Sequence, residues 1–180
     1  MKTKIFKGKK ITIRNILEED FKNIRKFKDF VDSLVEEQAK VSMKKRVSLE
    51  EEKRWIERKM KGIENLKEVF LLAECEDKIV GTTGITLEKD RRDHIGGFGI
   101  TIRKGYRRIG LGKYLMNEIL KKAKKELKPR PKIIRLSVFL SNKPAIALYK
   151  KIGFKTVAKI PKQLQYKGKL EGEGIMIKIF

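Results

Sequence analysis

The sequence has few of the residues that build disulfides, metal centres and catalytic dyads. It contains one cysteine, one histidine and one tryptophan in 180 residues. A single cysteine excludes an internal disulfide and a metal site built from several cysteines, so no metal is expected. Cys75 lies in the apolar stretch VFLLAEC, which is typical of a strand, and we interpret it as a core residue rather than a nucleophile.

Long hydrophobic runs are also absent from the sequence. No apolar stretch approaches the ~18 residues that a transmembrane helix requires, and the N-terminal MKTKIFKGKK has no apolar segment behind its lysines. We therefore expect a cytoplasmic protein without a membrane partner. With 40% hydrophobic and 38% charged residues and no Pro/Gly/Ser linker, residues 1–180 are expected to form a single domain.

Acidic residues become scarce in the second half of the chain. Residues 1–90 contain 22 Lys and Arg against 18 Asp and Glu, whereas residues 91–180 contain 24 against 5. The second half should therefore form a positive surface, which favours an anionic ligand or a nucleic acid. The mixture of Glu and Lys in the first half is typical of proteins from a thermophile.

The spacing of apolar residues predicts a mixed α/β chain. Ser48 and Glu51 have the spacing of a capping box at the start of a helix, and Asn142 is placed to cap another that ends at Gly153. The expected strands are 9–15, 94–103, 133–138, 154–167 and 173–180, together with a hairpin over 69–88 that turns at residues 76–78. The expected helices are 17–34, 110–127 and 142–153, and a further one that begins at Ser48 and carries Trp55, Ile56 and Met60.

Two glycines in RRIGLGKYL, residues 107–115, stand where a helix is expected to begin. The spacing Gly105 to Gly110 fits a nucleotide P-loop, but Leu111 and Gly112 replace the Lys and Ser/Thr that this motif requires. A dinucleotide fingerprint fails because the third glycine is missing. A third interpretation is an anion site at a helix start, where free amides and the helix dipole attract a pyrophosphate.

The pattern Arg107-x-x-Gly110-x-Gly112, after a strand and opening a helix, resembles the acyl-CoA signature of the GNAT acetyltransferases. A second block, LSVFLSNKPAIALYKKIGFK over 136–155, resembles the family's second signature. Its matching residues are Val138, Asn142, Ala145, Leu148, Tyr149, Gly153 and Phe154. The resemblance covers about residues 70–180, and the first third matches only in its strand-helix-helix order.

This resemblance implies the GNAT acyl-CoA N-acyltransferase fold, a mixed and mostly antiparallel sheet flanked by about four helices. The sheet would splay between the fourth and fifth strands, 94–103 and 133–138, and admit the pantetheine arm of acetyl-CoA. Glycines 96, 97 and 99 are compatible with a bulge there. Asn142 would either contact the arm or serve only as a helix cap. The residues implied for the cofactor are Ile100, Ile102, Arg107, Arg108, Ile109, Gly110, Leu111, Gly112, Lys113 and Asn142.

The resemblance also implies direct transfer of an acetyl group to an amine in a ternary complex. Tyr149 matches the general acid that protonates the leaving CoA thiolate, which suits a phenol of pKa ~10. The glutamate that many members use as a base is missing from GGFGITI. Asp93 and His94 are the nearest titratable candidates for a base, Glu74 is a weaker one, and a water chain without a dedicated base is a further alternative.

The acceptor is the least determined part of the prediction. By resemblance its pocket is built from residues 17–62 and 160–175, where similarity to the family is poorest. We expect a primary amine on a small molecule, an amino acid, a protein N-terminus or a lysine, bound by a monomer or homodimer. The alternative is a nucleic-acid- or ribosome-associated binding protein on the same scaffold, favoured by the positive second half. An enzyme that works on a protein bound to nucleic acid would reconcile both, with weak nucleic-acid association through the basic second half.

Overall fold

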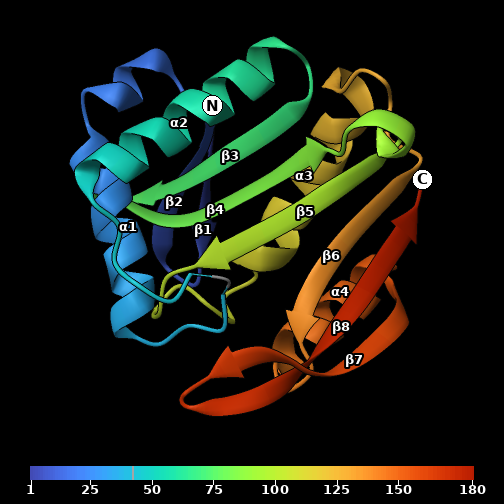
Figure 1. The fold of residues 1–180 in the computed structure, drawn as a ribbon. Helices are drawn as coiled ribbons and strands as arrows, with labels where there is room; N and C mark the ends of the chain where they lie inside the picture. The colour runs from blue at the N-terminus through green and yellow to red at the C-terminus, as the bar shows by residue number, and fades with distance from the viewer. Residues whose placement is uncertain (42) are drawn as a thin grey trace.

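The computed structural model describes residues 1–41 and 43–180, with Phe21 described by its backbone alone. Eight strands and four α-helices make up the fold, together with two short 3-10 helices (Figure 1). The strands are β1 (Lys2–Phe6), β2 (Lys9–Asn15), β3 (Glu68–Cys75), β4 (Lys78–Leu87), β5 (Ile95–Ile102), β6 (Ile133–Phe139), β7 (Lys155–Tyr166) and β8 (Lys169–Ile179). The helices are η1 (Glu18–Phe21), α1 (Ile24–Glu36), α2 (Leu49–Glu64), η2 (Asp90–Arg92), α3 (Leu111–Glu126) and α4 (Lys143–Ile152).

All eight strands form one mixed sheet in the order β1-β2-β3-β4-β5-β6-β8-β7. Every neighbouring pair is antiparallel except β5 and β6, which are parallel. The parallel pair needs a crossover, and α3 supplies it. The predicted fold class, a mostly antiparallel sheet with four flanking helices, is confirmed.

Helices cover both faces of the sheet and create two cores. Helices α1 and α2 lie over one face, which is the front face in Figure 1, and α3 and α4 lie behind it. The core behind the sheet is the larger, with Leu115, Met116 and Ile119 of α3 completely buried. The front core packs Phe27 and Leu34 of α1 against the sheet. No helix among the described residues is both long and apolar enough to cross a membrane.

Local sequence signals place most of these elements correctly. The Ser48 hydroxyl accepts from the Glu51 amide while the Glu51 carboxylate accepts from Ser48, which is the predicted capping box. The Asn142 side chain accepts from the Ala145 amide at 3.4 Å, and α4 ends at Gly153 with φ of +99°. The hairpin between β3 and β4 turns where it was expected.

The structure departs from the sequence analysis at three places. Strand β1 was not predicted, because KTKIF is lysine-rich and mostly exposed. The helix expected over 17–34 is interrupted, since the carboxylate of Asp20 accepts from the Leu17 amide and from Arg14 and closes a separate 3-10 turn. The glycines of β5 are compatible with a bulge, but they form none against β4: β4 and β5 keep one register throughout.

Strands β5 and β6 separate along most of their length. They pair only from Ile95 opposite Ile133 to Gly97 opposite Arg135. Beyond this closed end, β5 continues to Ile102 and β6 to Phe139 without pairing to each other. Figure 1 shows the two strands diverging toward the β7–β8 hairpin. The splay predicted between these two strands is therefore present.

Candidate active site

The loop between β5 and α3 carries a row of backbone amides without acceptors. Within the described chain, no group accepts a hydrogen bond from the amides of residues 107–113. The amide of Tyr114 is the first in α3 to reach a carbonyl, that of Gly110, at 3.1 Å. The first turn of α3 contains no acidic residue. Free amides at a positive helix end form a site that suits a phosphate group.

Positive φ angles shape this loop and explain one of its two signature glycines. Gly105, Arg108 and Gly110 have φ of +86°, +59° and +93°. A Cβ on Gly110 would meet only the ring of Phe6, at 3.9 Å, so space does not require the glycine. The left-handed backbone does. Arg108 holds the same conformation with a side chain, a strain that is found at functional sites.

Gly112 is needed for a different reason. It lies inside α3, and a Cβ there would come within 3.2 Å of Leu148 Cδ2 and 3.3 Å of Ile102 Cδ1. These contacts are tighter than ordinary packing, so the glycine lets α3 approach both α4 and β5. The two glycines therefore have separate roles: Gly110 shapes the loop, and Gly112 sets the position of the helix.

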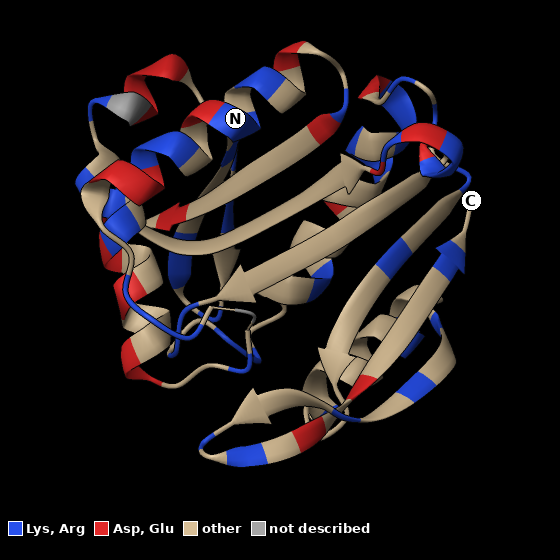
Figure 2. Ribbon diagram, in the orientation of Figure 1, with Lys and Arg blue, Asp and Glu red and all other residues tan. Residues whose placement is uncertain are grey.

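Basic residues gather in this loop (Figure 2). The guanidinium of Arg107 donates to the carbonyl of Ile102 at 2.6 Å and forms an ion pair with Glu37 at the end of α1. The side chain of Arg107 therefore joins the end of β5 to the end of α1. Its backbone amide belongs to the row of free amides over residues 107–113. Arg108 and Lys113 are exposed. Ile109 is partly buried and Leu111 is fully buried in the core behind the sheet.

Alternate residues of β5 turn their backbone groups into the splay. The Glu88 amide donates to Ile95 O and the Arg103 amide donates to Val80 O, each at 2.9 Å. The backbone N–H and C=O groups of odd-numbered β5 residues therefore point toward β4. Those of Phe98, Ile100 and Ile102 point away from β4, into the splay.

The open edge of β5 fits the donor that the sequence implies. The backbone groups of Ile100 and Ile102 lie on the part of this edge that does not pair with β6, and Arg107 donates to the carbonyl of Ile102. That these two residues bind the cofactor arm stays a prediction. Their side chains pack on the core behind the sheet, so structural and binding roles coexist in these two residues. Acetyl-CoA combines an extended arm with a pyrophosphate, and the splay leads directly to the row of free amides.

Tyr149 is held in an aromatic cluster beside the splay. Its ring lies edge-on to Phe98 of β5 with centroids 6.2 Å apart, and its centroid is 6.1 Å from that of Phe154. Only 8% of the residue is exposed, and its hydroxyl hydrogen-bonds to no described residue. Burial raises the pKa of Tyr149 to about 12, so the phenol keeps its proton and remains a donor at neutral pH.

Two of the three candidate bases, Asp93 and His94, lie at the closed end of the splay. Asp93 follows η2 and is exposed, and the carbonyl of His94 accepts from the amides of Lys132 and Ile133. His94 precedes Phe98 by four residues, which is about 13 Å along a strand. Glu74 forms an ion pair with Arg14 at 2.7 Å on β3, two strands away from β5.

Sequence reasoning missed two residues of the site. Phe98 forms the aromatic contact of Tyr149, and Glu37 holds Arg107. Neither residue has a local sequence signal, because each contact joins parts of the chain that are far apart: Glu37 and Arg107 are 70 residues apart, and Phe98 and Tyr149 lie on different elements. No group of metal-ligating side chains occurs among the described residues. One concave surface of about 610 Å³ lies beside α2, and another of about 260 Å³ lies between α4 and the strands β6, β7 and β8.

Comparison with known proteins agrees with this geometry. An L-amino acid N-acetyltransferase (AaaT) of Escherichia coli is 35% identical over 47% of this chain and 51% of its own length. An N-alpha-acetyltransferase of Sulfurisphaera tokodaii is 34% identical over 53% of this chain and 63% of its own length. The chain thus spans between half and two thirds of these two relatives.

Solved structures share the whole fold. A GNAT acetyltransferase of Streptococcus pneumoniae has a TM-score of 0.81 at 25% identity, covering 94% of this chain and 99% of its own. The putative acetyltransferase yncA of Salmonella typhimurium, solved with its cofactor acetyl-CoA, has a TM-score of 0.78 at 16% identity, covering 94% and 93%. At that identity the second likeness shows the fold alone.

A match to a family model identifies the family as well as the fold. The model of the acetyltransferase (GNAT) family matches residues 27–154, a span that contains the splay, the loop of free amides and Tyr149. The relatives above are acetyltransferases, and they do not favour the alternative of a nucleic-acid-binding module. The sequence blocks, the splayed sheet and the family match agree: the chain belongs to the GNAT acetyltransferase family.

Proposed function

We propose that this protein transfers the acetyl group of acetyl-CoA to a primary amine by direct attack in a ternary complex. The observation that carries the proposal is the row of seven free amides, residues 107–113, at the end of an unpaired strand edge. The amides of Arg108 to Gly112 bind the pyrophosphate, with the charges of Arg107, Arg108 and Lys113 close by. Phe98, Ile100 and Ile102 bind the arm, beside Asn142 at the start of α4.

Acetyl-CoA, when bound, supplies a thioester carbonyl for attack and a thiolate that needs a proton. The hydroxyl of Tyr149 donates that proton, because its pKa of about 12 keeps it protonated and no described partner competes for it. The acceptor nitrogen gains a bond to the acetyl carbon and loses a proton. The carbon–sulfur bond breaks, the proton lost by the amine passes to water, and Tyr149 regains a proton from solvent.

We assign removal of the amine proton to water, with His94 and Asp93 as the titratable groups that end the water path. The length of strand between His94 and Phe98 rules out direct contact between His94 and an amine beside Tyr149. Replacing His94 with Gln should move the acid limb of the rate profile if His94 accepts the proton. An unchanged profile in His94→Gln and in Asp93→Asn leaves transfer to bulk water.

The acceptor proposed is an amino group on an amino acid or at a protein N-terminus. The names of the two curated relatives support this class, since one is an L-amino acid and the other an N-alpha-acetyltransferase. The test is release of CoA thiol from acetyl-CoA in the presence of free amino acids, N-terminal peptides and simple amines. Tyr149→Phe should lower kcat about 100-fold or more with each active acceptor. No thiol release with any amine contradicts the proposal.

We also propose where the protein works, how it assembles and what it associates with. We place the single domain of residues 1–180 in the cytoplasm of a thermophile, as a monomer or homodimer. Weak nucleic-acid association is supported by the 24 basic residues against 5 acidic ones in the second half. Fluorescence anisotropy of a labelled RNA at low and high salt tests the association, and sedimentation tests the oligomeric state.

A further inference from the structure

Four groups surround the ammonium of Lys40, a residue of the connection that follows α1 along the chain. Its Nζ donates to both carboxylate oxygens of Glu171, at 3.1 and 3.3 Å, and to the hydroxyl of Ser141. The same nitrogen lies 4.7 Å from the ring centroid of Tyr166 and 5.9 Å from that of Phe139. A carboxylate, a hydroxyl and two aromatic rings form a complete binding site for an alkylammonium ion. We call these four residues the ammonium cage.

The walls of the ammonium cage are held together without Lys40. The rings of Phe139 and Tyr166 are edge-to-face, with centroids 5.8 Å apart. The Ser141 hydroxyl donates to the Glu171 carboxylate. All four residues come from the end of β6 and from the β7–β8 hairpin, whereas Lys40 is 101 residues from the nearest hydrogen-bonding wall residue. The cage is therefore a site built by one part of the molecule and filled by another.

The ammonium cage stands at the open end of the splay. Because Gly97 pairs with Arg135, the parallel register places Phe139 level with Thr101, near the end of β5. Leu136 and Val138 of β6 are buried in the core behind the sheet, so Phe139 points to the front face, where α1 and α2 lie. On the proposed function, the phosphates of acetyl-CoA bind at the start of α3 behind the sheet, which leaves the front face for the acceptor.

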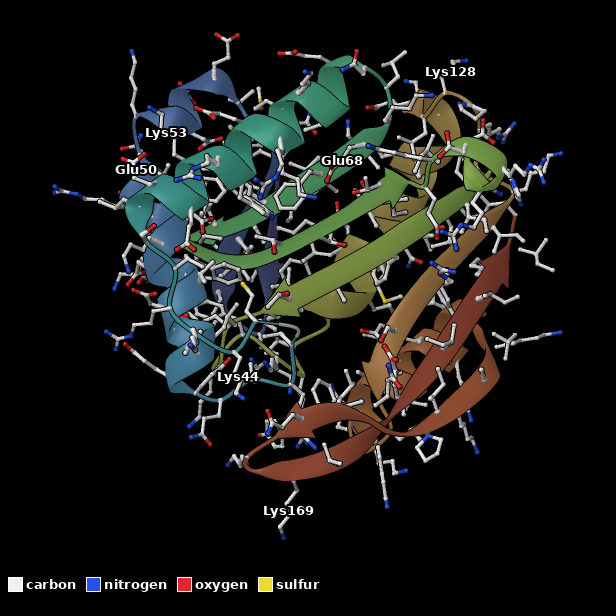
Figure 3. The ribbon with its side chains drawn as sticks, viewed as in Figure 1. Lys44, Glu50, Lys53, Glu68, Lys128 and Lys169 are labelled. Atoms are coloured by element: carbon white, nitrogen blue, oxygen red, sulfur yellow. The ribbon has the colours of Figure 1, made fainter. Side chains whose placement is uncertain are left out.

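A short segment after α1, residues 37–41, crosses that open end. At one side Glu37 forms an ion pair with Arg107 of the phosphate loop, and at the other Lys40 fills the cage. Between them the carbonyl of Gln38 accepts from the hydroxyl of Tyr166 at 2.9 Å. Figure 3 shows Lys44, a little further along the same connection, on the side facing the hairpin whose turn carries Lys169.

We propose that the ammonium cage is the subsite for a second positive charge on the acceptor, and that Lys40 occupies it as an intramolecular substitute until the acceptor arrives. This inference rests on the acetyl transfer proposed above. Phe98, against which Tyr149 packs, is level with Leu136, three residues before Phe139. The cage therefore lies on the order of 10 Å along the strand from the level of Tyr149. The acceptor class is therefore an amino acid or peptide N-terminus with a second ammonium at about this distance, such as a peptide with a nearby lysine, and a long diamine mimics its two charges.

Removing the Lys40 side chain should empty the cage and let an added alkylammonium ion enter. The probe is n-butylammonium chloride, titrated into ¹⁵N-labelled protein and followed by NMR. Lys40→Ala should show saturable shifts of the Phe139, Ser141 and Glu171 amides, with binding at least tenfold tighter than in wild type. Adding Glu171→Gln to this variant should remove the gain. Lys44→Ala, which loses a contact with Gln165 but leaves the cage filled, should behave as wild type.

Kinetics give a second readout of the same proposal. Lys40→Ala should lower KM at least fivefold for a long diamine and leave KM for n-butylamine unchanged. Equal binding of the probe by wild type and Lys40→Ala, or binding that survives Glu171→Gln, overturns the proposal. Thermal melts establish that each variant is folded. Acetyl-CoA titration of the same proteins tests the proposed function separately, because the hydrogen bonds recorded for the cage among the described residues do not reach the phosphate loop.

Discussion

At the scale of single residues, Tyr149 links the packing of the core to the chemistry. The sequence block around it predicts its place on α4, because its neighbours are all on one helix. The partner that orients its ring, Phe98, comes from a strand 51 residues earlier, and no local pattern identifies it. The same holds for Arg107, whose binding to Glu37 depends on how α1 ends. Helix caps are predictable from sequence, and contacts across the sheet are not.

The raised pKa of Tyr149 gives a prediction about rate and pH. Because burial raises the pKa to about 12, the proton needed by the thiolate stays on the phenol up to pH 10. The kcat should therefore show no alkaline decline between pH 8 and pH 10, measured with saturating acceptor. Tyr149→Phe should melt within about 2 °C of wild type, because its ring contacts remain. A decline with an apparent pKa near 9 that disappears in this variant contradicts the assignment.

Glu52 gives a prediction about stability and pH. Burial, and next the charge of Asp32, raise its pKa from 4.5 to about 7, while Lys28 acts in the opposite direction. A carboxyl group that is harder to ionise when folded stabilises the protein fully below pH 4.5 and loses this contribution as pH rises to 7. Glu52→Gln should therefore raise the free energy of unfolding by about 1–3 kcal/mol at pH 8 and by little at pH 4.5.

Denaturant titration of Glu52→Gln at the two pH values measures this difference. The matched control is Glu50→Gln, an exposed glutamate in the same first turn of α2. The control should change stability by less than about 0.5 kcal/mol at either pH. Equal effects of Glu52→Gln at pH 4.5 and pH 8 would show that the cost of ionising Glu52 is not the cause.

At the scale of elements, the start of α3 is where sequence pattern and structure agree best. The two glycines predict a loop open to phosphate, and the amides are indeed free. The sequence does not show why each of the two positions requires glycine. One depends on a φ angle, and the other on the distance between α3 and its neighbours. The missed strand β1 has a similar cause, since its exposed lysines carry no alternation and only pairing with β2 makes it a strand.

Gly112→Ala tests the packing role of this glycine. The new methyl group would press on Leu148 and Ile102, and overpacking of this kind costs about 1–3 kcal/mol. The shift of α3 should also weaken acetyl-CoA binding severalfold. Gly99→Ala is the control, because a Cβ at Gly99 meets nothing within 4 Å. If both variants melt at the same temperature as wild type, close packing is not the reason for Gly112.

At the scale of the whole molecule, the net charge of +23 exceeds what one small ligand needs. In Figure 2 the central strands carry few charges, while the loops and helices around them carry many. A field of this sign attracts acetyl-CoA over a distance and weakens as salt screens it. The sequence alone shows that basic residues outnumber acidic ones in the second half. Where those basic residues lie relative to the splay could be seen only from the fold.

Salt should therefore weaken donor binding through the phosphates. Between 50 and 500 mM NaCl, the Kd for acetyl-CoA should rise about tenfold, measured by calorimetry at constant pH. Acetylpantetheine, which has the arm but no pyrophosphate, is the matched control, and its KM as a donor should change less than twofold. A salt-independent Kd for acetyl-CoA would mean that the loop amides and basic residues do not hold the phosphates.

The most direct test of the account is calorimetric titration of acetyl-CoA into wild type and Gly110→Glu. The substitution puts a side chain on a backbone with φ of +93° and a negative charge among the free amides. We predict micromolar binding with one site per chain in wild type, and a loss of at least 100-fold in the variant. Circular dichroism establishes that the variant is folded. Wild type that binds no acetyl-CoA, or a folded variant that binds as tightly, would contradict the assignment of this loop.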